Sequence, residues 1–301
     1  MTHIAGKVAV VTGAGSGIGR ALALQLARRR CSLALTDVVP ADLEHTAAAC
    51  RRAGAADVMT SVVDAANRDA VTHHAGQVLD RFGAVHLLFN NAGIGLVAEV
   101  LEQRLDDVQR ILDVNLGGVI NGTQVFLPHL IASGGGHLIN ISSIFGMIAI
   151  PTQSAYHASK FAVRGYTEGI AVEMRMAGHP VRVSCVHPGG IATNIARNAH
   201  LRGPRDRHEV ASLFDQLATT SPERAARTIL RGVERNRTRI MVGADAHALH
   251  LMGQLLGSRY LGVVAAIGRR RLAALDNGSA ARVAGGSTPT PPIVGAGEAA
   301  S

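Results

Sequence analysis

Tyr156 and Lys160 stand four residues apart and are the pair of side chains in this sequence best suited to acid–base chemistry. They lie in a segment with a helical pattern, Ser154–Ala177, where this spacing places two side chains on one face. An ammonium group beside a phenol favours the phenolate, so we expect Lys160 to lower the pKa of Tyr156 from about 10 toward neutral pH. A phenol tuned in this way can exchange a proton with an alcohol or a ketone.

The composition makes a lysine at position 160 unexpected. Lysine and arginine together number 30, yet only Lys7 and Lys160 are lysines. A compact ammonium does not replace a planar guanidinium, so the choice of lysine here favours a specific use. The pair alone is also compatible with an ordinary exposed helix surface, and its interpretation therefore depends on the elements around it.

A glycine-rich turn near the N-terminus indicates a dinucleotide site. It follows an apolar run, Lys7–Val11, that predicts a buried strand, and it precedes a helical pattern that begins near Arg20. Glycines let the backbone approach a pyrophosphate, and the helix N-terminus offers free N–H groups, although glycines also serve ordinary turns. The residues expected to bind the cofactor here are Gly13, Ser16, Gly17, Ile18 and Gly19.

Asp37 follows the second predicted strand, Ser32–Thr36, near the distance at which a carboxylate can bind both hydroxyls of an adenosine ribose. The same carboxylate would repel a 2′-phosphate, and the next residues, Val38 and Val39, supply no positive charge. The sequence therefore predicts NAD in preference to NADP. The alternative is that Asp37 serves only a strand-end turn or a helix cap.

Five further apolar runs predict strands, and small or polar residues follow most of them. The runs are Asp57–Val63, Val85–Phe89, His137–Ile141, Val181–Val186 and Arg239–Val242. The candidate site residues that follow them are Asp64, Ala65, Asn91, Ala92, Gly93, Ser143, Pro188 and Gly189. We expect Asp64 either to accept from an adenine amino group or to cap a helix that starts at Asn67, and Asn90–Gly93 is also compatible with a simple turn.

Candidates at the ends of successive strands predict an open parallel sheet, because ligands bind outside the carboxyl ends of the strands in such folds. We expect an α/β fold with a doubly wound, Rossmann-like parallel sheet of about seven strands and helices on both faces. Residues 1–245 are predicted to form one domain, in which 189–217 is a mobile flap over the substrate. Residues 246–275 are predicted to be a helical extension, and 276–301 a disordered tail.

Asn115 is an unfavourable residue in a stretch that otherwise has a helical pattern. A helical pattern runs from about Glu99 to Ile131, and asparagine followed by Gly117 and Gly118 is unfavourable inside a helix. We expect a functional kink at this point. The alternative is that the glycines only permit close helix packing.

The composition excludes several classes of protein. The formal charge is +8, but the basic residues are scattered, and only 3% of residues are aromatic, which argues against a base-stacking nucleic-acid module. The three cysteines have no metal-ligand spacing, so we expect no metal site. No signal peptide is recognised before the first predicted strand, which makes the cytoplasm the expected location.

The C-terminal part carries a separate hypothesis. We recognise no run long and apolar enough to span a bilayer. Apolar residues nevertheless recur at helical spacing over His250–Leu275, and Arg269, Arg270 and Arg271 lie near the end of that stretch. Such a basic amphipathic helix is able to contact an anionic membrane surface, or alternatively to pack on the protein body or on a second subunit.

Taken together, these motifs resemble the short-chain dehydrogenase/reductase superfamily. The resemblance covers about residues 5–245 and rests on Thr12-Gly13-x-x-x-Gly17-x-Gly19, Asn90-Asn91-Ala92-Gly93, Asn115, Ser143, Tyr156-x-x-x-Lys160 and Pro188-Gly189. It implies that Tyr156 is the general acid and base, and that Lys160 lowers its pKa and holds the nicotinamide ribose. It also implies that Ser143 bonds the substrate oxygen and that Asn115 supports a water linking Lys160 to solvent.

The resemblance also implies a cofactor site and an assembly. Gly13, Ser16, Ile18, Asp37, Asp64 and Asn91 would line the dinucleotide, with Pro188, Gly189, Ile191 and Thr193 at its nicotinamide end. The superfamily forms homodimers, often doubled into homotetramers, through helices that correspond here to Asp106–Ile131 and Ser154–Ala177.

These observations favour reversible hydride transfer between NAD(H) and a secondary alcohol or ketone. Apolar residues near the strand ends favour a hydrophobic substrate: Ile94, Phe145, Met147, Ile148 and Ile150. The alternatives are that these residues only pack the loop, or that arginines of the flap bind an acid or an acyl thioester. A second class, a non-catalytic NAD-binding regulator or scaffold, would not need Ser143, Tyr156 and Lys160 together. A serine hydrolase is disfavoured because Ser143 lacks a G-x-S-x-G elbow.

Overall fold

The computed structural model describes residues 1–193, 195, 198–204 and 206–269. The chain divides into two compact units, Met1–Gly257 and Ser258–Ser301. The first unit contains the sheet. The described part of the second, 258–269, is helical. The predicted tail 276–301, with Arg270 and Arg271, lies outside the described residues.

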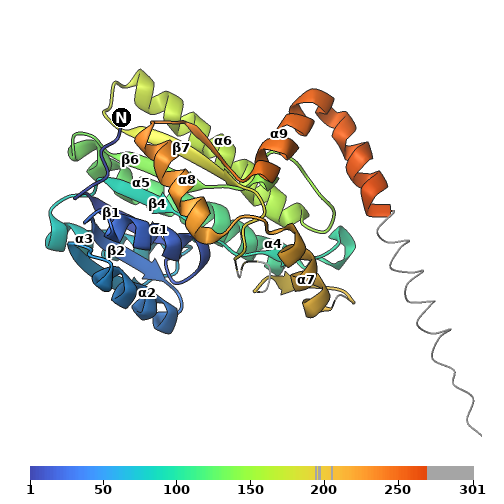
Figure 1. Ribbon diagram of the computed structural model, residues 1–301, viewed down its shortest axis with the longest axis horizontal. Coiled ribbons are helices and arrows are strands. Elements are labelled where there is room, and N and C mark those ends of the chain that lie inside the picture. The colour runs from blue at the N-terminus through green and yellow to red at the C-terminus, as the bar shows by residue number, and fades with distance from the viewer. Residues whose placement is uncertain (194, 196–197, 205, 270–301) are drawn as a thin grey trace, which may run out of the picture. The chain divides into compact units, whose positions relative to one another are not determined.

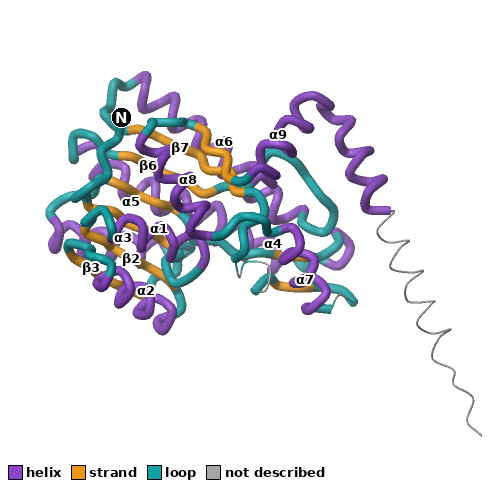
Figure 2. Tube along the Cα trace, viewed as in Figure 1, coloured by secondary structure: helices purple, strands orange, loops and turns teal. Residues whose placement is uncertain are grey.

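The first unit is built on a parallel sheet of seven strands, in the order β3-β2-β1-β4-β6-β7-β9 (Figures 1 and 2). The strands are β1 (Val8–Thr12), β2 (Ser32–Asp37), β3 (Asp57–Val62), β4 (Leu87–Asn90), β6 (His137–Ile141), β7 (Arg182–Pro188) and β9 (Arg239–Val242). Every neighbouring pair is parallel. The order reverses between β1 and β4, which is the doubly wound arrangement that the strand pattern predicts.

Helices cover both faces of the sheet (Figure 1). The helices of the described chain are α1 (Gly17–Ala27), α2 (Pro40–Arg52), α3 (Arg68–Phe82), α4 (Leu105–Leu112), α5 (Gly118–Ala132), α6 (Ser154–Met176), α7 (Arg207–Leu217), α8 (Pro222–Glu234) and α9 (Ala244–Leu256), of which α7 and α9 lie to the side of the sheet. Leu22 of α1 and Ile229 of α8 belong to one core, together with Val11 of β1. Phe126 of α5 and Val10 of β1 belong to a second core. Successive strand residues thus enter opposite cores, so the central strands are buried on both faces.

The segment between β4 and β6 is less regular than the single helical pattern predicted for it. A 3₁₀ turn (Val100–Glu102) precedes α4, and a π-helical turn (Asp113–Gly117) joins α4 to α5. Asn115 lies in that π turn, which confirms the predicted break in the helix.

A small second sheet was not predicted. β5 (Leu96–Val97) pairs in parallel with β8 (His200–Leu201), and next to it Arg202 donates two hydrogen bonds to Asp107, at 2.7 and 3.0 Å. Strands of two residues carry no recognisable pattern in a sequence. The described part of the predicted flap is therefore tied to the segment that follows β4.

The helical stretch Ala244–Arg269 requires a correction. It is 26 residues long and contains an 18-residue window that has a mean hydropathy of 1.2 and no buried residue, so its length and composition suffice to cross a membrane. The expectation that the sequence contains no such run was wrong. Few charged residues interrupt it, and its leucines, valines and alanines keep the mean hydropathy high despite its glycines and the 3₁₀ turn Gly257–Arg259.

Two buried histidines should make the fold sensitive to acid. Burial lowers the pKa of His74 to about 4 and that of His137 to about 3. Below the unfolded-state pKa of about 6.5, the unfolded chain therefore binds more protons than the folded one, and stability falls with falling pH. We expect the free energy of unfolding, measured with urea, to drop by about 4 kcal/mol between pH 7 and pH 5, at about 1.4 kcal/mol per group for each pH unit below about 6.5.

His74→Leu should flatten this pH dependence, because neither ring nitrogen of His74 has a hydrogen-bond partner among the described residues. The matched control is His45→Gln, since His45 is exposed on α2. Equal stability of the wild type at the two pH values would contradict the prediction.

Candidate active site

The ends of the strands gather the predicted site residues at one edge of the sheet. Parallel pairing sets Thr12 beside Thr36, Asn90 beside Asn140 and Ile141 beside Val186. Asp37, Asn91, Ser143 and Pro188 lie at or just beyond these positions. The candidates therefore share the carboxyl edge, as the sequence predicts.

Ser143, Tyr156 and Lys160 meet at the point where β6 faces the start of α6. The Ser143 side chain hydrogen-bonds to that of Tyr156. Lys160 Nζ donates to the carbonyl oxygen of Ile141 at 3.1 Å and lies 5.7 Å from the centroid of the Tyr156 ring. Ser143 and Lys160 are buried, at 7% and 3% exposure, so water is largely excluded from both residues.

The expected lowering of the Tyr156 pKa is wrong for this structure. Burial of the phenol raises the pKa of Tyr156 to about 12, and the hydrogen bond with Ser143 opposes this in part. Burial also lowers the pKa of Lys160 to about 8. The ammonium is bonded to the Ile141 carbonyl and lies over the ring, so loss of solvation dominates at the phenol oxygen.

Asn115 is fully buried and holds the loop after β4. Its Oδ1 accepts from Ile94 N at 2.8 Å, and its Nδ2 donates to Ile94 O at 3.0 Å and to Ser159 Oγ at 3.1 Å. A Cβ added at Gly93 would lie 3.2 Å from Asn115 Oδ1 and 3.4 Å from Lys160 Nζ. Asn115, Gly93 and Lys160 are thus neighbours, while the water link implied for Asn115 stays a prediction.

The glycine-rich turn has the shape of a phosphate cradle. Gly13 and Gly17 have φ values of +63° and +52°, which favour glycine. A Cβ at Gly19 would collide with the Gly13 carbonyl oxygen. Ser16 is the exposed N-cap of α1 and makes no side-chain capping bond, and Ile18 lies in the first turn. The first N–H groups of α1 and the space left by these glycines fit a pyrophosphate.

Asp37 contacts this turn directly. Its Oδ2 accepts from Gly15 N at 2.8 Å, and its Oδ1 accepts from Val39 N at 3.1 Å. Asp37 therefore does stabilise the turn at the end of β2, as the alternative predicts. Its carboxylate also lies beside the glycine-rich turn, the position expected for a carboxylate that binds the adenosine ribose. Each oxygen keeps a lone pair for a further donor.

Asp64 is exposed and does not cap α3. It accepts from Ala66 N at 3.0 Å, while Asn67 is the N-cap and accepts from Ala70 N at 3.0 Å. The capping alternative for Asp64 was therefore wrong, because the N-cap of α3 is Asn67, three residues later. Ala65 is buried, and a Cβ at Gly118 would lie 2.9 Å from the Ala65 Cβ.

Asn91 ties the ends of β1 and β4 together. Its Nδ2 donates to Thr12 O at 2.9 Å and to Gly13 O at 3.1 Å, while the backbone N–H groups of Asn91 and Ala92 both donate to Thr12 Oγ1. The amide therefore holds the glycine-rich turn in place. Thr12 belongs to the glycine-rich motif, but the role of its hydroxyl as an acceptor for two backbone N–H groups was not predicted.

The segment after β7 crosses toward the same turn. Gly189 N donates to Val242 O at 2.9 Å, and Ile191 forms an isolated parallel bridge with Thr220. A Cβ at Gly17 would lie 3.0 Å from Thr193 Cγ2. Pro188, Gly189, Ile191 and Thr193 thus run from β7 to the glycine-rich turn, as expected for one end of the site.

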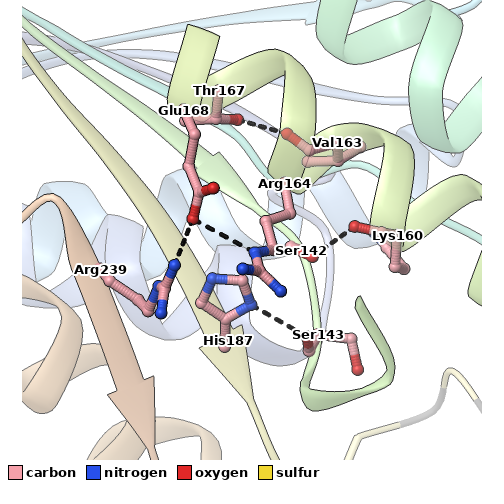
Figure 3. A network of polar contacts seen from close by, with 9 residues as sticks. All are labelled: Ser142, Ser143, Lys160, Val163, Arg164, Thr167, Glu168, His187 and Arg239. Atoms are coloured by element: carbon pink, nitrogen blue, oxygen red, sulfur yellow. Dashed lines mark hydrogen bonds and ion pairs between the residues drawn. The ribbon is translucent and has the colours of Figure 1, made fainter. Parts of the chain in front are cut away.

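A polar network behind Ser143 was not predicted (Figure 3). His187 Nδ1 contacts the Ser143 carbonyl oxygen at 3.0 Å, and Ser142 Oγ donates to Lys160 O at 2.8 Å. Glu168 accepts from Arg164 at 3.2 Å and from Arg239 at 2.5 Å, near the buried His187. These residues come from β6, α6, β7 and β9, so only the strand order brings them together.

Comparison with known proteins agrees with this geometry. The short chain dehydrogenase family matches residues 7–202. The chain is 51% identical over 267 residues to SadH of Mycobacterium tuberculosis, named as an oxidoreductase, covering 88% of this chain and 96% of that protein. It is 30% identical over 263 residues to estradiol 17-beta-dehydrogenase 11 of Rattus norvegicus, covering 87% of this chain and 83% of that protein.

Solved structures give the same result. A short chain dehydrogenase/reductase from Burkholderia phymatum in complex with NAD superposes with a TM-score of 0.79 at 30% identity, covering 87% of this chain and 96% of that one. A short chain dehydrogenase from Mycobacterium paratuberculosis bound to NAD gives a TM-score of 0.71 at 25% identity, covering 81% of this chain and 99% of that one. The chain therefore belongs to the short-chain dehydrogenase family of oxidoreductases, which act on CH–OH groups with a nicotinamide cofactor.

Proposed function

We propose that the protein transfers hydride reversibly between NAD(H) and a hydrophobic secondary alcohol or ketone, with Tyr156 as general acid and base. The observation that carries the proposal is the contact of Ser143 with Tyr156, above Lys160, at the carboxyl edge of the sheet. The cradle of Gly13, Gly17 and Gly19 at the same edge fits the dinucleotide. A non-catalytic scaffold would require none of the three side chains in this arrangement.

The chain's own residues supply the proton and the polar contacts. The cofactor supplies the hydride when it is bound. With a pKa of about 12, Tyr156 holds its proton at neutral pH and is ready to donate it to a developing alkoxide. The Ser143 hydroxyl is a preorganised donor for the same oxygen. Lys160 Nζ lies 5.7 Å from the centroid of the Tyr156 ring, and its positive charge favours the phenolate that remains after proton transfer.

The surroundings of the site support an apolar substrate. Phe145 and Met147 are partly exposed on the loop after β6, and Ile94 is partly exposed after β4. Arginines of the flap provide less support for an acidic substrate. Arg202 already pairs with Asp107, and Arg207 donates to Ala199 O at 3.1 Å.

The test is a screen for NADH oxidation with matched ketones. Apolar cyclic and long-chain ketones should give kcat/KM values at least about 10-fold above those of polar ketones of equal size, because each buried methylene contributes about 0.8 kcal/mol. Ser143→Ala should lower kcat by about 10²-fold with the best ketone, as expected for loss of an oxyanion donor. A preference for carboxylated or thioester substrates would overturn the substrate class, and full activity of Ser143→Ala would overturn the assigned role.

The cofactor preference is part of the same proposal. Asp37 beside the glycine-rich turn supports NAD over NADP. The homodimer or homotetramer, the cytoplasmic location and the contact of the C-terminal helix with a membrane stay predictions.

A further inference from the structure

Asp245, in the first turn of α9, reaches the segment that follows β7. Its Oδ2 accepts from Gly190 N at 2.5 Å. The neighbouring Gly189 N donates to Val242 O at 2.9 Å, and Gly190 O accepts from Thr220 N at 3.2 Å. The three partners of the Gly189–Gly190 backbone thus come from the stretch 220–245, and Asp245 is the one that contributes a side chain.

Two glycines make the space that this carboxylate fills. A Cβ at Gly189 would overlap the Asp245 carboxylate, and a Cβ at Gly243 would collide with its Oδ1. Gly243 has a φ of +102°, a conformation that other residues rarely adopt. Oδ1 is buried with no hydrogen-bond partner in the part of the chain that the structure describes. Burying a carboxylate oxygen without a hydrogen-bond partner costs free energy, whereas an apolar side chain would fill the same space without that cost. The carboxylate is therefore expected to have a role beyond filling space.

The segment fixed by Asp245 borders the reacting end of the site. β7 is the neighbour of β6, which leads to Ser143, and the segment ends with Thr193 against Gly17. A dinucleotide with its ribose at Asp37 and its pyrophosphate at the glycine-rich turn must bring its reactive ring toward Tyr156. Gly190 is therefore expected to lie next to the nicotinamide ring, whereas Asp37 lies at the adenosine end of the cofactor.

We propose that Asp245 is a positioning residue that couples α9 to the nicotinamide end of the cofactor site by fixing Gly190. This inference rests on the proposed function for the identity of the cofactor. The negative charge suits both of its contacts, because it strengthens the bond from the Gly190 N–H and lies at the N-terminus of α9.

The first test uses the protein without any cofactor. Amide hydrogen exchange, followed by mass spectrometry, should show faster exchange over 189–193 in Asp245→Ala than in the wild type, with unchanged exchange over β6. The matched control is Asp69→Ala, since Asp69 holds the same second helical position in the first turn of α3 and is exposed. Unchanged exchange over 189–193 in Asp245→Ala would overturn the claim that Asp245 fixes this segment.

The second test separates the two ends of the cofactor. Asp245→Ala should weaken NADH binding by about 10-fold, as expected for one charged hydrogen bond, and leave ADP-ribose binding unchanged, because ADP-ribose lacks the nicotinamide. Asp245→Asn keeps an acceptor for Gly190 N–H and should restore NADH affinity to within about three-fold. Equal weakening of both ligands would show a general loss of structure and overturn the proposal, as would unchanged NADH binding. A wild type that binds neither ligand would instead overturn the proposed function, and the exchange result would still stand.

Discussion

Replacing Tyr156 by phenylalanine should lower turnover by about 10³-fold and leave the affinity for NADH within about three-fold of the wild type. Phenylalanine keeps the ring that lies over Lys160 Nζ but removes the oxygen that contacts Ser143. The variant lacks the proposed proton donor, while the glycine-rich turn and Asp37, which are proposed to bind the rest of the dinucleotide, are unchanged. Single-turnover oxidation of NADH with the best ketone measures the loss, and a fluorescence titration measures the affinity.

The matched control is Tyr166→Phe. Tyr166 lies on the same helix, α6, and packs partly buried against the second core, so its variant also removes one phenolic oxygen. Its turnover should stay within about two-fold of the wild type, because its ring packs on the second core and its hydroxyl makes no hydrogen bond to a described site residue. If Tyr156→Phe retains more than about a tenth of the wild-type turnover, the proton comes from another group and the assigned role of Tyr156 is wrong.

The sheet was predictable because its strands are buried on both faces. Such strands read as short apolar runs, and the seven runs in this sequence correspond to the seven strands, with ends that shift by one or two residues. The motif residues then follow from the architecture: Ser143 and Asn91 come after strand ends, and all strand ends of a parallel sheet lie together. The kink at Asn115 was predictable because asparagine and glycine oppose a regular helix.

Contacts between distant elements were not predictable. His187 meets the Ser143 carbonyl only because β7 lies beside β6, and Asp245 meets Gly190 only because β9 lies beside β7. No spacing in the sequence encodes either contact. The predicted direction of the Tyr156 pKa shift was wrong for a related reason. The charge of Lys160 can be read from the sequence, whereas the burial that raises the pKa is a property of the fold.

The wild type should bind NADH at least about 100-fold more tightly than NADPH, a difference of about 2.7 kcal/mol. Asp37 lies beside the glycine-rich turn, with Oδ2 bonded to Gly15 N at 2.8 Å. A 2′-phosphate near this carboxylate would face a like charge, which costs about 4 kcal/mol at 4 Å near a protein surface and less where salt screens it. Paired fluorescence titrations with the two reduced cofactors, at low and at high salt, measure the ratio and its screening.

Asp37→Ser tests the cause of that ratio. It removes the repulsion and the ribose acceptor together, so NADPH should bind about 10-fold more tightly and NADH about 10-fold more weakly than in the wild type. Asp80→Ser is the matched control, because Asp80 is an exposed aspartate on α3 and its loss changes the net charge equally. If Asp80→Ser moves the ratio as far as Asp37→Ser does, long-range charge sets the preference and the ribose contact is refuted. If the wild type prefers NADPH, the Asp37 carboxylate only holds Gly15 and Val39, and the cofactor half of the proposed function must be reversed.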